Sequence, residues 1–265
     1  MKTFAIVILV FFASACIETH EHYTAELTTN PEEIESGTPV EFSFLVKKSN
    51  GEIAGDLEIV HEKPMHLFMV SSDLSQYFHE HPKQQADSTY LLPFTFPNGG
   101  NFKIFIDFKP KDDEQTVESF DVEVAGDAPE KVELVPDEVF EKSVEGITVK
   151  MKPDGELLKH KDLVFKFDVF DSASGEPVTD LENYLGAKAH FVIIRKGLGR
   201  FVHAHPMSPE EMANMSGGMK MKPDAKSTSQ VSAMTNFPNS GVYKVFAQFK
   251  RNGKVITVTY VLQVK

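Results

Sequence analysis

Cysteine is nearly missing from this sequence, since Cys16 is the only one in 265 residues. A single thiol excludes an intramolecular disulfide and any thiolate cluster for zinc or an iron–sulfur centre. A blue-copper centre needs a cysteine ligand, which is unavailable if Cys16 carries another group. No nucleophile motif, glycine-rich phosphate loop or paired-carboxylate signature stands out either. The sequence therefore predicts a protein that is not an enzyme.

Basic residues are also fewer than acidic residues. The chain has 27 Lys and Arg against 39 Asp and Glu, which gives a net charge of −12. Such a field repels phosphate backbones, so we expect no nucleic-acid partner. The 22 phenylalanines supply ample material for a packed core. The length suits one large domain or two modest ones.

The amino terminus has the pattern of a secretory signal. Lys2 is followed by an apolar run from Phe4 to Phe12 and then by the small residues Ala13-Ser14-Ala15. An apolar stretch of about 7–15 residues between a charged start and small residues is typical of a signal peptide. Such a stretch is too short to span a bilayer as a mature helix. We predict that residues 1–15 form a signal peptide.

Small residues directly before Cys16 resemble the bacterial lipobox, although Ala13 stands where that family usually has Leu. The resemblance implies cleavage before Cys16 and a lipid on its sulfur. It predicts a lipoprotein held at a membrane outside the cytoplasm, in the periplasm or at the cell surface, with residues 16–22 as the tether. The alternative is an ordinary signal peptide with a cysteine nearby by chance.

The chain contains an internal repeat of four matched blocks in the same order. The offset between the copies is 123 or 124 residues through Pro206 and 141 residues afterwards, so 17 extra residues lie between Pro206 and Phe237. The blocks are PVEFSFLV (39–46) with DLVFKFDV (162–169), MHLFMV (65–70) with AHFVII (189–194), YFHEHP (77–82) with FVHAHP (201–206), and FPNGGNFK (96–103) with FPNSGVYK (237–244). Because chance rarely produces such a series, we predict two copies of one folding unit.

Both units have the two-residue alternation of strands. Phe42, Phe44 and Val46 alternate with polar or smaller neighbours, and glycine turn signals such as Asn252-Gly253 separate the runs. The pattern predicts an all-β fold of two tandem β-sandwich modules of the immunoglobulin-like or cupredoxin-like type. We expect the first module at 23–125, a connector at 126–146 and the second module at 147–265, with a methionine-rich insertion at 207–226.

Six of the ten histidines occupy equivalent positions in the two units. Their shared spacing is His-x12-His-x-His-Pro, formed by His66, His79 and His81 in the first unit and by His190, His203 and His205 in the second. In the first unit, residues 65–70 and 77–82 are predicted to form a hairpin. A turn centred on residues 72–73 sets His66 opposite His79, and one centred on residues 73–74 sets it opposite His81. Either register puts all three on one face, because strand side chains repeat every two residues.

Three imidazoles on adjacent strands suit Zn²⁺ or Cu²⁺. We therefore predict a metal site in each unit. The alternative is a structural role, in which the histidines hydrogen-bond strand ends while Pro82 and Pro206 end their strands.

Methionine is concentrated in the insertion. Met207, Met212, Met215, Met219 and Met221 lie within 20 mostly polar residues. Thioether sulfur is a soft ligand that selects Cu(I), so Met212, Met215, Met219 and Met221 are candidate copper ligands beside the second histidine triplet. The alternative is a short amphipathic helix that packs Met212 and Met215 on the sandwich.

The motifs YLGAKAH (184–190), FVHAHP (201–206) and FPNSGVYK (237–244) resemble a group of poorly characterised exported bacterial proteins with a Gly-His and His-x-His-Pro signature. Members of that group are often associated with copper or heavy-metal efflux, which implies a metal-efflux or envelope protein as a partner. The resemblance covers the second unit better than the first. Ala189 replaces the usual glycine, and the first unit reads HEKPM (61–65) before His66.

The sequence thus predicts an extracytoplasmic lipoprotein that binds or buffers a transition metal, with copper favoured over zinc. The alternative is a non-catalytic structural or interaction lipoprotein of the cell envelope that binds no metal.

Overall fold

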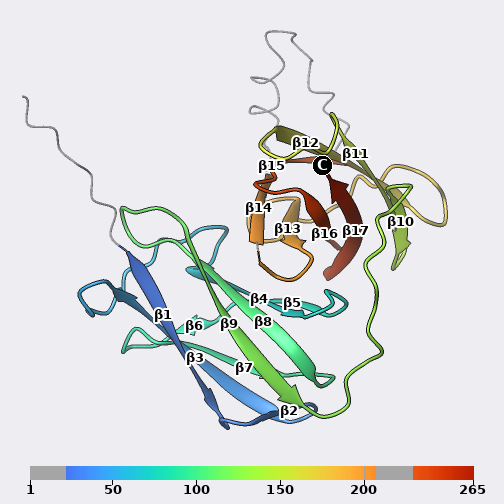
Figure 1. The fold of residues 1–265 in the computed structure, drawn as a ribbon. Coiled ribbons are helices and arrows are strands. Elements are labelled where there is room, and N and C mark those ends of the chain that lie inside the picture. The colour runs from blue at the N-terminus through green and yellow to red at the C-terminus, as the bar shows by residue number, and fades with distance from the viewer. Residues whose placement is uncertain (1–21, 200, 207–228) are drawn as a thin grey trace, which may run out of the picture.

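The computed structural model describes residues 22–199, 201–206 and 229–265 (Figure 1). These residues form strands and no helix. A helix long and apolar enough to cross a membrane is accordingly not found among them. The predicted signal peptide (1–15), the lipidation site Cys16 and the predicted insertion (207–226) with its methionines lie outside the described residues.

The first module is a sandwich of a four-stranded and a five-stranded sheet, ordered β1-β3-β7-β6 and β2-β9-β8-β4-β5. Its strands are β1 (Tyr23–Asn30), β2 (Ile34–Glu35), β3 (Pro39–Lys48), β4 (Met65–Ser71), β5 (Tyr77–Glu80), β6 (Lys83–Gln84), β7 (Tyr90–Thr95), β8 (Gly100–Phe108) and β9 (Thr116–Ala125).

The second module folds around one eight-stranded sheet, ordered β10-β11-β12-β15-β14-β13-β16-β17. Its strands are β10 (Glu141–Val144), β11 (Ile147–Pro153), β12 (Asp162–Asp171), β13 (Ala189–Arg195), β14 (Phe201–Pro206), β15 (Gln230–Asn236), β16 (Gly241–Arg251) and β17 (Lys254–Val264). Because β10 pairs with β11, residues 141–144 of the expected connector belong to this module.

The two modules share one strand topology, so the sequence repeat is also a structural repeat. The pairs β1·β3, β4·β5 and β4·β8 of the first module correspond to β11·β12, β13·β14 and β13·β16 of the second. One difference concerns β14, which pairs with β13 through residues 201–204 and with β15 through residues 205–206. In the first module these two roles are divided between β5 and β6. The all-β, two-module fold predicted from the alternating pattern is confirmed.

Alternation decides which face of each strand enters a module core. In β3, Val40, Phe42, Phe44 and Val46 are buried while their neighbours are more exposed. Together with residues of the opposite sheet they form the core of the first module. Phe165, Phe167 and Val169 of β12 do the same in the second module.

β4 and β13 depart from this alternation, because both of their faces are covered. Every residue of β4 is buried. Met65, Leu67 and Met69 point into the core of the first module. Phe68 and Val70, on the other face, enter a third apolar cluster that joins the modules. The members of this interface cluster are Phe68, Val70, Leu74, Phe105, Leu134, Val192, Ile194, Leu198 and Phe246.

The modules therefore dock through equivalent sheets (Figure 1). Tyr77 of β5 stacks on Phe246 of β16, with ring centroids 4.2 Å apart and planes 12° from parallel. The Lys244 ammonium donates to the Leu74 carbonyl over 2.8 Å. Leu134, from the segment between the modules, closes the cluster. Apolar burial and polar contacts thus fix one module against the other.

Replacement of Phe246 by alanine tests this docking. We expect Phe246→Ala to lower the free energy of unfolding by about 3–5 kcal/mol, because a buried ring is lost and a cavity remains at the interface. Chemical denaturation followed by circular dichroism measures the change. Val135→Ala is the control, since Val135 is 67% exposed, and should change stability by less than about 0.5 kcal/mol. Equal effects of the two substitutions would contradict the docking described here.

Candidate metal centre

The hairpin of β4 and β5 sets the positions of the first histidine triplet. Phe68 lies opposite His79, and Leu67 lies opposite Glu80. Continued by one residue, this register sets His66 opposite His81, which is the second of the two registers predicted above. The turn is held by Asp73, whose Oδ1 accepts hydrogen bonds from the hydroxyls of Ser71 and Ser75.

The second hairpin repeats this register. Val192 lies opposite His203, so that His190 comes opposite His205 one step further along. His66, His79 and His190 therefore lie on the strand face that the modules turn towards each other.

The three imidazoles of the first module converge on one point. His66 Nδ1 lies 3.2 Å from His79 Nε2 and 3.2 Å from His81 Nε2. Among the described residues, these three side chains form the one group of His, Cys, Asp or Glu whose ligand atoms all lie within 4.8 Å of one another. His66 is 4% exposed, and the other two rings are partly buried.

In two of these rings, the nitrogen that points away from the other histidines (the outer nitrogen) contacts a hydrogen-bond acceptor. His66 Nε2 lies 3.0 Å from the carbonyl oxygen of Val60, which can only accept a hydrogen bond. His79 Nδ1 lies 2.7 Å from Gln248 Oε1. The amide nitrogen of Gln248 donates to Thr257 Oγ1, so its oxygen faces His79 as an acceptor. Each ring consequently carries its proton on the outer nitrogen.

The inner nitrogens of these two rings face each other. With the outer protons in place, neutral rings carry their lone pairs on His66 Nδ1 and His79 Nε2, and the two atoms are 3.2 Å apart. His66 Nδ1 can also accept a hydrogen bond from His81 Nε2, which lies at the same distance. A cation between these nitrogens would be stabilised by their lone pairs.

Protonation of His79 and His81 is disfavoured, so a proton does not readily take the place of this cation. Burial, followed by the nearby His81, holds the pKa of His79 well below its usual range. Burial, together with the neighbouring His66, lowers the pKa of His81 to about 3. Both rings are therefore neutral at pH 7, and the neutral imidazole is the form that binds metal ions.

Two tight turns cover the cluster from both modules. Val60 and Lys63 exchange two backbone hydrogen bonds around His61-Glu62, as Tyr184 and Ala187 do around Leu185-Gly186. All four central residues have positive φ, between 49° and 79°, as a two-residue type I′ turn requires. A Cβ placed on Gly186 would lie 3.7 Å from Glu62 Cγ, so the two turns are in contact.

The turns bring further rings towards the triplet. The His61 ring lies 6.1 Å from that of His66 and 5.0 Å from that of His190, measured between centroids. Tyr184 lies 6.2 Å from His79 and 5.6 Å from His190. His190 Nε2 lies 3.1 Å from the Leu185 carbonyl, which repeats the contact of His66 with its own turn. The centre is thus assembled at the junction of the modules.

The predicted site residues divide into three groups. His66, His79 and His81 are brought together, and His190 lies beside them with its ring centroid 6.4 Å from that of His66. His203 and His205 are on β14, but their side chains lie outside the described part of the structure. Met212, Met215, Met219, Met221 and Cys16 lie entirely outside the described residues.

Sequence reasoning missed the contribution of Gln248. It lies opposite His190 on β16, and Asp107 lies opposite His66 on β8. Both are buried polar residues within mainly apolar runs, in the segments KIFIDF (103–108) and KVFAQF (244–249). A polar residue kept at one position of an apolar strand in both copies was the available signal. Its partner could be found only in the folded protein.

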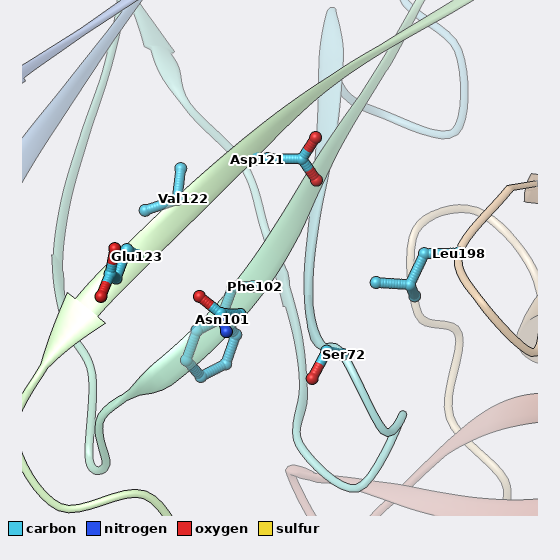
Figure 2. Close-up of a pocket in the computed structure, with 7 residues that line it drawn as sticks. All are labelled: Ser72, Asn101, Phe102, Asp121, Val122, Glu123 and Leu198. Carbon is cyan, nitrogen blue, oxygen red and sulfur yellow. The ribbon is translucent and has the colours of Figure 1, made fainter.

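A pocket of about 370 Å³ elsewhere in the molecule is distinct from this centre. It lies beside the first residues of β8 and the last half of β9, near Leu198 of the second module (Figure 2). Asp121 and Glu123 give it acidic side chains, and Asp121 pairs with Lys103 over 2.7 Å. No histidine lines it. The pocket is therefore not part of the histidine cluster.

The comparisons with known proteins give a family. A family model described as "Domain of unknown function (DUF8832)" matches residues 18–126 and 142–265. The chain belongs to this family. The two matched segments of this DUF8832 protein coincide closely with its two modules. No curated protein matches the sequence.

Solved structures similar to this DUF8832 protein include surface proteins of bacteria. Invasin, a bacterial integrin-binding protein, is 10% identical with a TM-score of 0.26, and the match covers 92% of this chain and 40% of invasin. Domains 5–6 of the S-layer protein SbsC are 13% identical with a TM-score of 0.26, and 92% and 98% of the two chains are covered. The chain spans 31% of the longer SbsC structure that holds domains 4–9.

Acid should destabilise the folded protein through the histidine cluster. The pKa values of His79 and His81 are lowered in the folded state, so below about pH 6.5 the unfolded chain binds protons that the folded chain does not. The free energy of unfolding is therefore expected to fall as the pH is lowered from about 6.5 towards 3.

Urea denaturation at several pH values measures this slope. The double variant His79→Gln/His81→Gln should show a shallower slope, and His160→Gln, at an exposed position outside the cluster, should keep the wild-type slope. A wild-type slope in the double variant would contradict the assignment of the acid sensitivity to these rings.

Proposed function

We propose that this DUF8832 protein binds a divalent transition-metal ion through His66, His79 and His81. The observation that carries the proposal is the convergence of His79 Nε2 and His81 Nε2 on His66 Nδ1, each over 3.2 Å, while the outer nitrogens of His66 and His79 contact Val60 and Gln248. Metal-binding histidines commonly donate their other N–H to a carbonyl or carboxylate, which fixes the tautomer and the ring.

The spacing of the nitrogens supports a shared ion. Two nitrogens bound to one tetrahedral ion at about 2.0–2.1 Å lie about 3.4 Å apart. Both contacts of His66 Nδ1 measure 3.2 Å, so a small outward movement of the rings would admit the ion. Three protein ligands leave a fourth position for water or another small ligand.

Copper is favoured, with zinc as the alternative. A set of three neutral imidazoles suits both Cu²⁺ and Zn²⁺, and for a given set of ligands the intrinsic affinity is higher for Cu²⁺. The methionine-rich insertion adds to the case for copper, because Met212, Met215, Met219 and Met221 would offer thioethers to Cu(I). The efflux association of the group that the chain resembles points in the same direction.

A second ion would bind to the second module. The candidate ligands His190, His203 and His205 have the spacing of the first triplet, and their strands have the same register. The bond from His190 Nε2 to the Leu185 carbonyl turns its other nitrogen into an acceptor, as in His66.

In this proposal the protein captures or buffers metal and performs no catalysis. It works outside the cytoplasm, tethered to a membrane through a lipid on Cys16, and delivers metal to or receives it from an efflux or envelope protein. The signal-like residues 1–15 and the position of Cys16 directly after Ala13-Ser14-Ala15 support this location.

Metal retention tests the proposal. Purified protein loaded with Cu²⁺ or Zn²⁺ and passed through a desalting column should retain at least one equivalent, measured by inductively coupled plasma mass spectrometry. His66→Gln, His79→Gln and His81→Gln should each lose the first-module ion, because two imidazoles hold it far more weakly than three.

His160→Gln is the matched control, since its ring is exposed and distant from the triplet in sequence. It should retain metal as the wild type does. If the folded wild-type protein retains neither metal, the proposal is contradicted and the structural or interaction role is favoured.

Substitution of Cys16 tests the location. In the native cell, Cys16→Ser should abolish incorporation of labelled fatty acid and move the protein from the membrane fraction to the soluble fraction, because the sulfur that carries the lipid is lost. Immunoblots of fractionated cells measure the change. Ser14→Ala, which keeps the small residues and the cysteine, should leave the distribution unaltered. Equal membrane association of the serine variant and the wild type would contradict the anchor.

A further inference from the structure

Gln248 belongs to the second module but contacts a ligand of the first. It lies on β16, is 6% exposed and stands opposite His190 in the strand register. Its Oε1 accepts a hydrogen bond from His79 Nδ1 over 2.7 Å, and its Nε2 donates to Thr257 Oγ1 over 3.3 Å. Thr257 thus orients the amide, and the amide orients the imidazole of the opposite module.

This bond selects the tautomer of His79. With Nδ1–H directed to Gln248, the lone pair of His79 is on Nε2, facing His66 Nδ1. Without the acceptor, His79 would gain by moving its proton to Nε2 and donating it to His66 Nδ1, 3.2 Å away. His79 Nε2 would then carry a proton, which would have to leave that atom before it could bind a metal ion.

We propose that Gln248 is a positioning residue for the metal centre of the first module, so that the centre is composite. One module supplies the three ligands, and the other supplies the acceptor that keeps them ready for metal. The inference rests on the proposed function, and it adds a link between metal binding and module docking. By thermodynamic linkage, an ion that binds the docked arrangement better than an undocked one also stabilises docking.

The repeat indicates that a carboxylate is tolerated at this strand position. Asp107 stands opposite His66 as Gln248 stands opposite His190. Its side chain is fully buried, and its Oδ1 accepts a hydrogen bond from Gln115 Nε2 over 2.7 Å. A glutamate at 248 would keep the acceptor and add a negative charge, which strengthens the basicity of a metal-bound imidazole.

The test compares three variants of the full chain in competition titrations with Cu²⁺ and, separately, Zn²⁺ against a chelator of known affinity. Gln248→Leu removes the acceptor at similar size and should weaken binding by about 10–100-fold. Gln248→Glu restores the acceptor and should bind at least as tightly as the wild type. Gln263→Leu, at an exposed glutamine of the adjacent strand β17, should bind as the wild type does.

Nitrogen-15 NMR of the metal-free proteins gives a second readout that a merely structural role would not change. The His79 ring should be protonated at Nδ1 in the wild type and in Gln248→Glu, and at Nε2 in Gln248→Leu. Folding of each variant is checked by circular dichroism.

The outcomes separate the two proposals. If the wild type binds neither metal, the proposed function fails. If the wild type binds and a folded Gln248→Leu binds equally well, the metal centre stands and the positioning role of Gln248 is overturned. Should Gln248→Leu not fold, Gln248→Glu decides, because wild-type affinity or better supports the role and a loss beyond tenfold overturns it.

Discussion

The docking of two equivalent sheet faces is the constraint on which the rest of the structure depends. Because β4 has the first core on one side and the second module on the other, His66 is removed from water together with Phe68 and Val70. A buried imidazole needs partners for its polar atoms, and the docked modules provide them. The turn carbonyl of Val60 comes from the same module, whereas the amide oxygen of Gln248 comes from the other. Docking thus sets the tautomer of His79.

Internal duplication explains why the histidines meet at this interface. Two copies of one module that dock through the same face present the same strand residues to each other, as in an isologous dimer. The turns at His61-Glu62 and Leu185-Gly186 and the contacts of His66 and His190 with turn carbonyls show this correspondence. The symmetry is approximate, since Gln248 in one copy corresponds to Asp107 in the other. The two halves of the interface therefore carry different polar side chains at this strand position.

Burial gives the cluster its chemical character. A histidine in water has a pKa of about 6.5. Desolvation lowers the pKa of His79 and His81 and keeps both rings neutral at pH 7. A neutral, preformed set of nitrogen donors loses little to proton competition at pH 7. The interface between the modules thus keeps these imidazoles neutral, as the interior of a single domain would.

The sequence by itself determined the strands, the duplication and the shared face of His66, His79 and His81, because the two-residue period and the spacing of 12 residues act within one hairpin. It did not choose between the two hairpin registers, since the turn position depends on how Asp73 bonds Ser71 and Ser75. It also assigned residues 141–144 to a connector, although they pair with β11. The second module's contribution through Gln248, and the approach of His61 and Tyr184, were decided only by tertiary structure. The contacts of Gln248 and Tyr184 with His79, and of His61 with His190, join residues more than 100 positions apart. No local pattern specifies which surface of one module will cover the other.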